Sequence, residues 1–352
     1  MRVLFLQQQP CTRAFKYAAA LSTAGSARPR LGFAYRGLTL SSLYGSGDEL
    51  FEGWWRMDGS PPAALRTALA EFRPDVIHSH NLPDTLTVLA LELTGGRVPV
   101  IHDVHDFQSL RSTPYEDGFP EPEDPLGLER RAVEGCAALV TVSDELLAEI
   151  GARHRLPSRT LVLPNYALRR YLPESVITER APDRPPRLVY QGTLSTNGGH
   201  YDLRGLFAAI IEQGVELHVY PGRPVEGYER LGIHLHETLP PSDLLRELPL
   251  YDLGWAGFDD GLNAAHLDTA LPNKVFEYLG CGLPVVTLRH RALSRFLAER
   301  GLGISLASVD DLARELETAD LPELRRRVAA ARLEFTFESK VGEILDLYEA
   351  VA

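Results

Sequence analysis

The chain has 352 residues, which is enough for two domains of ordinary size, each with its own core. Hydrophobic residues make up 44% and charged residues 24% of the sequence, as is typical of a soluble globular protein. The net charge of -12 argues against a nucleic-acid-binding protein and against a strongly basic membrane-surface protein.

The cysteine content and the N-terminal sequence indicate a cytoplasmic protein. Cys11, Cys136 and Cys281 have no metal-ligand spacing and form no even disulfide framework. The first residues, MRVLFL, are typical of a strand and lack the features of a signal peptide. No apolar segment reaches the ~18 residues that a membrane span needs, and the sequence gives no indication of peripheral membrane contact.

The first half of the chain alternates between apolar runs and helical patterns, with polar residues at the tips of the runs. This alternation of strand and helix patterns predicts an open parallel sheet with right-handed crossovers. We expect strands at 2–6, 31–35, 48–57, 74–80, 98–101, 138–142 and 160–163, and helices at 14–21, 61–72, 83–93, 126–136 and 143–154.

A proline-rich segment at 173–186 is the best candidate for a linker, and the same alternation of strand and helix patterns resumes after it. We expect strands at 187–191, 215–220, 251–256 and 285–288, and helices at 202–213, 244–248, 274–279, 290–300, 309–319, 321–335 and 337–351. The sequence therefore predicts two doubly wound α/β domains, at 1–172 and 187–336. Ligands of such sheets bind outside the carboxyl ends of the strands.

Two polar clusters follow predicted strands of the first domain. The sequence HDVHD, 102–106, places four ionisable side chains at the end of one strand, and HSHN, 78–81, ends another. In an extended run, Asp103 and His105 would lie on one face, with His102 and Asp106 on the other. An active site and a hydrogen-bonded strand tip are both consistent with HDVHD, whereas its spacing matches no familiar zinc site.

Two features of the second domain could bind an anion. Gly192 opens a glycine-rich loop directly after a strand, where bare backbone N–H groups can hold an anion, and Arg204 follows that loop. In LPNKVFEYLGCGLPVVTL, 271–288, Lys274 and Glu277 share one face of a short helix. They form either a surface pair or a site for a phosphate and a sugar hydroxyl. Only three lysines occur among the 36 basic residues, which favours a specific need at position 274.

The motif LPNKVFEYLGCGLPVV resembles the donor-site motif of retaining GT-B glycosyltransferases, in particular glycosyltransferase family 4. PDVIHSHN, VIHDVHDF, AALVTVSDELLA, LVLPN, LVYQGTLS and YDLGWAGF follow in the family's order. The resemblance implies a GT-B fold, in which two Rossmann-like domains face each other across a cleft and a final helix, 337–352, packs back on the N-terminal domain. It also implies transfer of a sugar, with retention, from a nucleoside diphosphate sugar to a small-molecule or glycan acceptor, without a metal or other cofactor.

The resemblance assigns roles to individual residues. Glu277 matches the glutamate that holds the donor ribose, and Gly192 and Thr193 match the loop that approaches the diphosphate. Lys274 or Arg204 would neutralise that diphosphate, and Asn273 belongs to the same donor motif. His105, with Asp106 beside it, is similar to the histidine that faces the transferred sugar, although His102 is close enough to compete for this assignment.

Three positions depart from the family's pattern. Thr269 occupies the place of a second glutamate, and Arg13 or Lys16 would have to replace a glycine pair after the first strand. Asn197 to His200 spread out the basic residues that usually follow the glycine loop. Thr269 and the missing glycine pair leave open a non-catalytic nucleotide-sugar-binding or partner subunit, and a GT-B sugar-nucleotide epimerase is a further alternative among enzymes. The sequence specifies neither the sugar, the base and the acceptor nor the oligomeric state.

Overall fold

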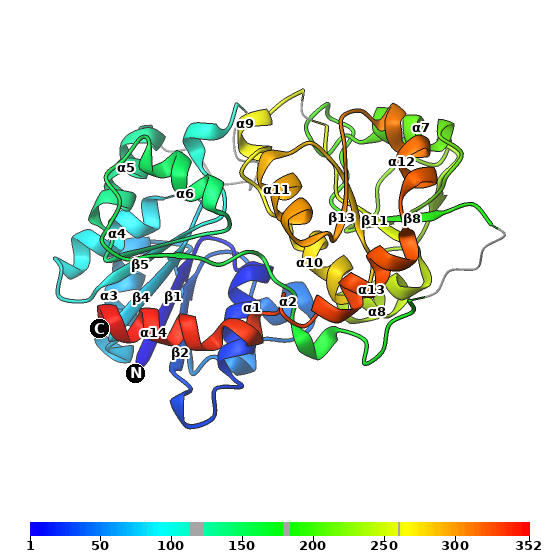
Figure 1. Cartoon of the computed structure of the whole chain (residues 1–352). Coiled ribbons are helices and arrows are strands. Elements are labelled where there is room, and N and C mark those ends of the chain that lie inside the picture. Colours follow the sequence, from blue (N-terminus) through cyan, green and yellow to red (C-terminus); the bar gives the residue numbers. More distant parts are fainter. Residues whose placement is uncertain (83, 113–122, 179–183, 260) are drawn as a thin grey trace. The chain divides into compact units, whose positions relative to one another are not determined.

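The computed structural model describes residues 1–82, 84–112, 123–178, 184–259 and 261–352. The chain divides into two compact units (Figure 1). Unit 1 comprises Met1–Pro164 and Phe337–Ala352, and unit 2 comprises Asn165–Thr336. Within the described ranges, no helix is long and apolar enough to cross a membrane.

Unit 1 is built on a seven-stranded parallel sheet in the order β3-β2-β1-β4-β5-β6-β7. The strands are β1 Arg2–Gln7, β2 Arg30–Tyr35, β3 Gly53–Arg56, β4 Val76–His80, β5 Val100–Val104, β6 Ala138–Thr141 and β7 Thr160–Val162. The helices are α1 Thr12–Leu21, α2 Leu40–Tyr44, α3 Pro61–Phe72, α4 Thr85–Thr94, α5 Pro125–Gly135, α6 Asp144–Gly151 and α14 Val341–Val351, with 3-10 turns η1 Gly25–Ala27, η2 Asp48–Leu50, η3 Gln108–Leu110 and η7 Phe337–Lys340. The strand order reverses between β1 and β4, which makes their carboxyl ends the expected ligand position.

Unit 2 carries a six-stranded parallel sheet in the order β10-β9-β8-β11-β12-β13. The strands are β8 Arg187–Gly192, β9 Glu216–Pro221, β10 His234–Leu235, β11 Leu253–Trp255, β12 Val285–Leu288 and β13 Gly303–Leu306. The helices are α7 Arg204–Glu212, α8 Pro241–Glu247, α9 Ala264–Leu267, α10 Asn273–Gly280, α11 Arg291–Arg300, α12 Leu312–Thr318 and α13 Leu321–Ala331, with 3-10 turns η4 Arg169–Tyr171, η5 Leu248–Leu250 and η6 Val309–Asp311. Here the order reverses between β8 and β11.

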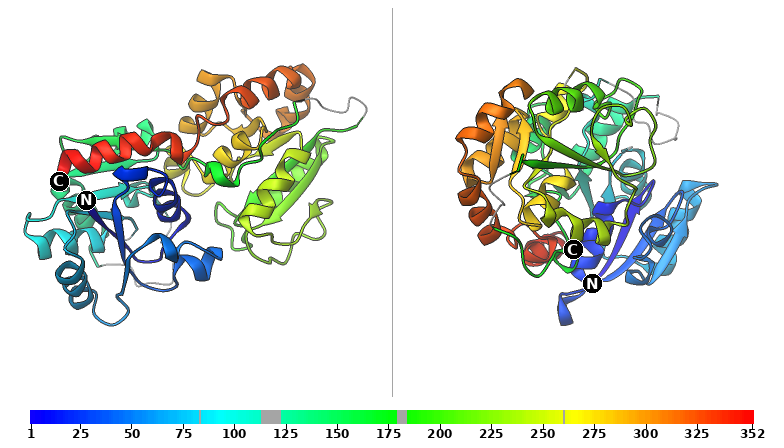
Figure 2. Two further views of the ribbon diagram at one scale, coloured as in Figure 1. Left: turned by 90° about the horizontal axis from the view of Figure 1, so that it is seen from below. Right: turned by 90° about the vertical axis from the view of Figure 1, so that its right-hand side faces the viewer.

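The predicted fold class, two doubly wound α/β halves, is confirmed by these two sheets. Each sheet buries its apolar strand residues beneath helices, as parallel sheets require. In unit 2, Tyr190, Phe207 and Trp255 are among the fully buried side chains of one such core. Both chain termini belong to unit 1 and lie near each other in all views (Figure 2).

The predicted strand at 48–57 is wrong in its first half. Residues Asp48–Leu50 form a 3-10 turn, and only Gly53–Arg56 is a strand. The carbonyl oxygen of Asp48 accepts hydrogen bonds from the Phe51 N–H and the Trp54 Nε1–H, which close the turn. The short strands β10 and β13 lie at the two edges of their sheet and were not predicted.

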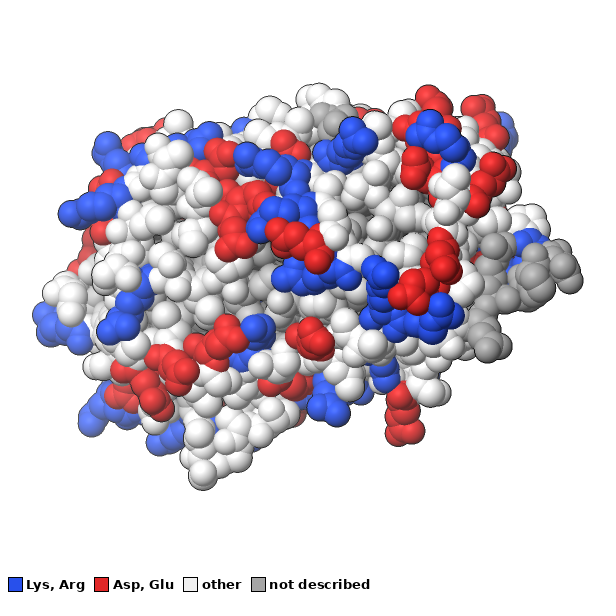
Figure 3. Space-filling model, viewed as in Figure 1, with Lys and Arg blue, Asp and Glu red and all other residues white. Residues whose placement is uncertain are grey.

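The segment expected to be a linker, 173–186, joins unit 2 in its described part, and 179–183 lie outside the described residues. Two arginines bind its backbone. Arg332 donates to the carbonyl oxygens of Pro173 and Glu174, each at 2.7 Å, and Arg325 donates to Ile177 O at 2.6 Å. Both guanidinium groups are therefore buried and structural. Basic and acidic side chains alternate over the face seen in Figure 3.

Candidate functional site

The carboxyl end of β8 approaches the first turn of α10 in unit 2. Gly192 ends β8 with φ +130°, a backbone conformation that favours glycine. A Cβ atom at this position would lie 3.3 Å from the Lys274 Nζ, so glycine also permits the close approach of the lysine. Thr193 is exposed directly after Gly192. The predicted donor-loop residues and Lys274 are therefore neighbours.

Lys274 is buried against aromatic rings. Its Nζ lies 3.8 Å from the Tyr190 ring centroid and 4.8 Å from that of Phe258. Within the described part of the chain, this nitrogen has no hydrogen-bond partner, and the residue is only 8% exposed. Burial lowers the pKa of Lys274 to about 7, although the nearby Glu277 favours the charged form. A buried ammonium held by ring faces alone is suited to receive an anion.

Glu277 lies one turn after Lys274 and is half-buried. The Gln191 Nε2 donates a 2.6 Å hydrogen bond to its Oε2, and the Gln191 backbone N–H donates to the Tyr278 hydroxyl at 2.9 Å. Gln191 therefore orients the carboxylate and ties α10 to the end of β8. Sequence reasoning missed this glutamine, although a polar residue directly before Gly192 at a strand end was a usable signal.

The start of α10 differs slightly from the expectation. The helix was predicted at 274–279, but it begins at Asn273, and Pro272 is its N-cap, with extended backbone. Thr269, at the position of the absent second glutamate, is 1% exposed, and its hydroxyl donates to His266 O at 2.9 Å. The threonine is thus occupied in a turn and offers no replacement carboxylate.

Arg204, the alternative phosphate-binding residue, begins α7. Its Nε and one Nη donate to the Asp202 carboxylate at 2.9 and 2.7 Å, and the same Nη donates to Thr196 O at 3.3 Å. The positive charge is therefore already paired and closes the glycine-rich loop. The structure thus brings Gly192, Lys274 and Glu277 together, whereas the contacts of Arg204 are with Asp202 and Thr196.

In unit 1, the two histidines of HDVHD occupy different environments. His102 is fully buried, and its Nδ1 lies 3.0 Å from the Thr87 Oγ1. His105 follows the end of β5; its side chain is 17% exposed, and its backbone N–H donates to the Asn81 Oδ1 at 3.1 Å. Burial lowers the pKa of His105, which favours the neutral ring. Asp106 lies beside it, with 3.9 Å between His105 Nε2 and the carboxylate.

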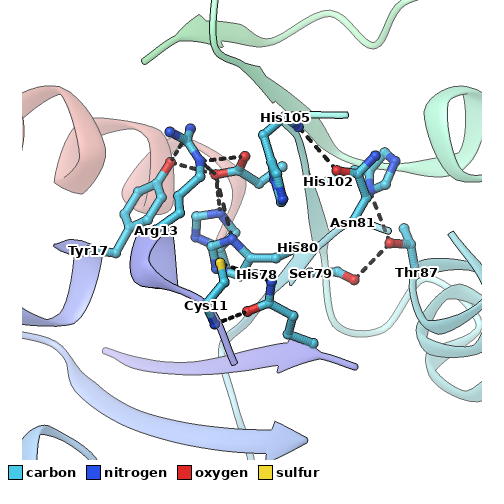
Figure 4. A network of polar contacts seen from close by, with 12 residues as sticks. Cys11, Arg13, Tyr17, His78, Ser79, His80, Asn81, Thr87, His102 and His105 are labelled. Atoms are coloured by element: carbon cyan, nitrogen blue, oxygen red, sulfur yellow. Dashed lines mark hydrogen bonds and ion pairs between the residues drawn. The ribbon is translucent and has the colours of Figure 1, made fainter. Parts of the chain in front are cut away.

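A buried polar network lies beneath these strand ends (Figure 4). The Arg13 Nε donates to both oxygens of Asp103, at 2.9 and 3.0 Å, and the Tyr17 hydroxyl donates at 2.8 Å. His78 is 3.4 Å from the same carboxylate, and its Nδ1 lies 2.7 Å from the Tyr348 hydroxyl of α14. Despite burial, Arg13 above all holds the pKa of Asp103 well below its usual range.

This network corrects the expectation that Arg13 or Lys16 replaces the glycine pair of the family. Both side chains are buried on α1, at 2% and 3% exposure. The Arg13 Nε contacts both oxygens of Asp103. If the arginine turned toward a ligand, the buried carboxylate would lose its counter-charge. Arg13 is therefore a structural residue of unit 1, and Lys16 does not reach the surface.

Two family models match consecutive parts of the chain. A glycosyl transferase 4-like domain covers residues 11–166, and a glycosyl transferase-like domain covers residues 203–342. A comparison with curated protein sequences finds no significant match.

Several solved structures share the fold over nearly the whole chain. Sucrose-phosphate synthase of Thermosynechococcus elongatus has a TM-score of 0.72 at 13% identity, covering 100% of this chain and 99% of that one. HepE of Anabaena in complex with UDP has a TM-score of 0.69 at 14% identity, covering 99% and 100%. WaaG, a glycosyltransferase involved in lipopolysaccharide biosynthesis, has a TM-score of 0.62 at 13% identity, covering 98% and 99%. With a matching domain model in each half and this fold, the chain is a GT-B glycosyltransferase that belongs to the family 4-like group.

Proposed function

We propose that this enzyme transfers a sugar from a nucleoside diphosphate sugar to a hydroxyl of a small-molecule or glycan acceptor, with retention of configuration. The observation that carries the proposal is the buried Lys274 ammonium, which lies beside Gly192 and lacks a hydrogen-bond partner among the described residues. A diphosphate would supply the missing counter-charge and hydrogen-bond acceptors. HepE, a relative in fold, was solved with UDP and with UDP-glucose, which makes uridine nucleotides the first donors to test.

The donor contacts follow from the chemistry of each group. The backbone N–H groups of Gly192 and Thr193 and the first turn of α10, with Asn273, present positive partial charge to phosphate oxygens. Lys274 provides the full charge. Glu277 accepts hydrogen bonds from the two ribose hydroxyls, and Gln191 holds its carboxylate in place. Each contact uses a group that the fold positions before the donor arrives.

Lys274, rather than Arg204, is assigned as the main counter-charge. Arg204 already forms an ion pair with the Asp202 carboxylate, so the net charge of the two side chains is close to zero. Moving the guanidinium to a phosphate would break these bonds and leave Asp202 without its main partner. We therefore assign to Arg204 the shaping of the glycine-rich loop, and only Lys274 is expected to change its protonation when a diphosphate binds.

In the transfer step, the bond between the sugar C1 and the β-phosphate oxygen breaks and a bond from C1 to the acceptor oxygen forms. The acceptor hydroxyl gives its proton to the leaving phosphate on the same face of the sugar. The charge growing on the diphosphate is stabilised by Lys274 and the N–H groups. His105, with Asp106 beside it, is assigned to face the transferred sugar, because His102 is fully buried.

The test uses a panel of nucleoside diphosphate sugars, beginning with UDP-glucose. Thermal shift identifies the donor, because a bound ligand raises the melting temperature. Release of nucleoside diphosphate in the presence of acceptor mixtures then measures transfer, and the anomeric configuration of the product tests retention. The wild-type chain is expected to bind a donor and release nucleoside diphosphate, and Glu277→Gln is expected to weaken the binding and slow the release. Donor binding without release or isomerisation would instead favour a non-catalytic subunit, and interconversion of the free donor would favour an epimerase.

A further inference from the structure

A cluster of three imidazoles and one carboxylate lies at the edge of the unit 2 sheet, and the donor site does not use it. We call Glu216, His218, His234 and His236 the histidine cluster. Glu216 and His218 are two residues apart on β9, so their side chains share one face of the sheet. His234 of β10 pairs directly with His218. Three of the eleven histidines thus gather around one glutamate.

The distances within the histidine cluster suit a metal ion. The Oε1 of Glu216 lies 3.1 Å from the Nε2 of His218 and 3.5 Å from the Nε2 of His234. The ligand atoms of these three residues all lie within 4.8 Å of one another. Atoms held ~2.0–2.1 Å from one tetrahedral zinc ion are about 3.3 Å apart. The two distances to Glu216 are close to this spacing, and the stacked rings of His218 and His234 would tilt toward a common central ion.

His236 provides the outer partner that metal-binding histidines usually have. Its Nε2 lies 2.9 Å from the Nδ1 of His218. If the Nδ1 of His218 carries the proton and donates it, the Nε2 presents its lone pair toward Glu216 and His234. The His236 ring also stacks on Tyr220 with centroids 4.2 Å apart, which fixes its orientation.

His218 and His236 have pKa values shifted toward the neutral state. Burial is the first cause that lowers the pKa of His218 and of His236, and neighbouring imidazoles lower both further, while Glu216 and Glu247 act in the opposite direction. His218 and His234 stack with ring centroids 4.5 Å apart.

We infer that Glu216, His218 and His234 form a binding site for a divalent transition metal of the zinc type, with His236 as the outer hydrogen-bond partner. Two imidazole nitrogens and one carboxylate oxygen are ligands that Zn²⁺ accepts, with the remaining position left for water. The ion would join β9 to β10, an edge strand of only two residues, His234–Leu235. Its role is to hold this edge, because the donor loop lies at the other end of β9, where Pro221 pairs with Gly192.

A second group of possible ligands, His78, His80 and Asp103 in unit 1, is a weaker candidate. The Arg13 guanidinium occupies both oxygens of Asp103, and Tyr17 donates to the same carboxylate. A cation at this position would face a fixed positive charge and would have to displace these bonds. Among the described residues, the hydrogen bonds and ion pairs of the histidine cluster involve no arginine or lysine.

The test measures zinc binding to the full chain after treatment with a chelator. Competition with a chromophoric zinc indicator is expected to give one site per chain, and zinc is expected to raise the melting temperature of unit 2. His234→Gln should abolish or strongly weaken the binding, and this side chain is 54% exposed, so the variant should fold. His236→Gln should weaken binding by ~10–100-fold, as the loss of an outer partner does.

His154→Gln provides the matched control, because the His154 Nε2 also faces a carboxylate, that of Glu129, at 2.7 Å, but belongs to unit 1. This variant should retain zinc binding. Circular dichroism checks that each variant is folded. The inference is overturned if the wild-type chain binds no zinc, or if zinc affinity is the same in His234→Gln and His218→Gln as in the wild-type chain.

Discussion

Replacing Lys274 with methionine should stabilise the donor-free protein while weakening donor binding. Methionine keeps the length and apolar stem of the side chain and removes the buried amine. The folded chain releases its Lys274 proton near pH 7, whereas the ordinary lysine pKa is 10.5. Between these values, the unfolded state binds more protons, so the charged amine opposes folding at neutral pH and this cost falls as the pH rises.

The size of the effect follows from that pKa difference. The difference between 10.5 and about 7 is 3.5 pH units, so at ~1.4 kcal/mol per unit the burial of the amine costs folding at most about 5 kcal/mol at pH 7. Relaxation of the site reduces this upper limit, and we expect Lys274→Met to raise the free energy of unfolding of unit 2 by about 1–3 kcal/mol, or a few degrees in melting temperature. Donor affinity should fall, because a charged hydrogen bond contributes about 1.5–3 kcal/mol.

Chemical denaturation of the wild-type and variant chains between pH 7 and 9, with and without nucleotide, measures both effects. The wild-type chain should gain stability relative to Lys274→Met as the pH rises through this range. Lys340→Met is the control, since Lys340 lies at the surface and pairs with Glu343; its effect should stay within ~0.5 kcal/mol. A Lys274→Met chain that is less stable without donor, or that binds nucleotide as well as the wild-type chain, would refute the reasoning.

Three further predictions concern other residues. Glu277→Gln should lower nucleotide affinity by about 1.5–3 kcal/mol in titration calorimetry, since a charged acceptor becomes neutral, and unchanged affinity would rule out the ribose contact. His105→Ala should lower kcat more than donor affinity, whereas alanine at the buried His102 should lower mainly the unfolding free energy; full turnover in His105→Ala would remove its assigned role. Arg13→Met should cost about 3–5 kcal/mol of unfolding free energy because it leaves Asp103 buried and unpaired. The folded pKa of Asp103 lies well below its ordinary 3.8, so the Arg13–Asp103 pair stabilises the fold fully above pH 3.8 and loses its effect as the pH falls below that value. Equal unfolding free energies of the wild-type and Arg13→Met chains at pH 7 would contradict the prediction.

Local patterns predicted the features that depend on neighbouring residues. The apolar runs located most strands, and the helix predicted at 274–279 matches α10 to within one residue at each end. The resemblance to family 4 singled out Lys274 and Glu277, which the structure places next to Gly192. The edge strand β10 was not predicted because it has only two residues and pairs on one side.

The environments of the same residues could not be predicted, because they depend on contacts across long sequence separations. The Lys274 amine lies over Tyr190, which precedes it by more than eighty positions in the sequence, and Gln191 reaches Glu277 over a separation of 86. Arg13 and Asp103 are 90 residues apart, so the sequence did not reveal that this arginine was already paired. Residue type suggested a charge, but only the fold determined which charges had partners.

The division of the chain has a consequence for how the protein folds. Unit 2 is continuous, and its ends are joined, because Ala167 forms a parallel bridge with Thr336 and its N–H donates to Phe335 O at 3.1 Å. Unit 1 is interrupted, and its last helix, α14, supplies Tyr348 to His78 across 270 positions. Once unit 2 has folded and Ala167 lies beside Thr336, the effective separation falls to about 100 residues, which lowers the entropy cost of bringing α14 back by about 0.9 kcal/mol. During synthesis, unit 1 can therefore be completed only after residues 337–352 have left the ribosome. A folded unit 2 then holds these residues closer to the rest of unit 1 along the chain.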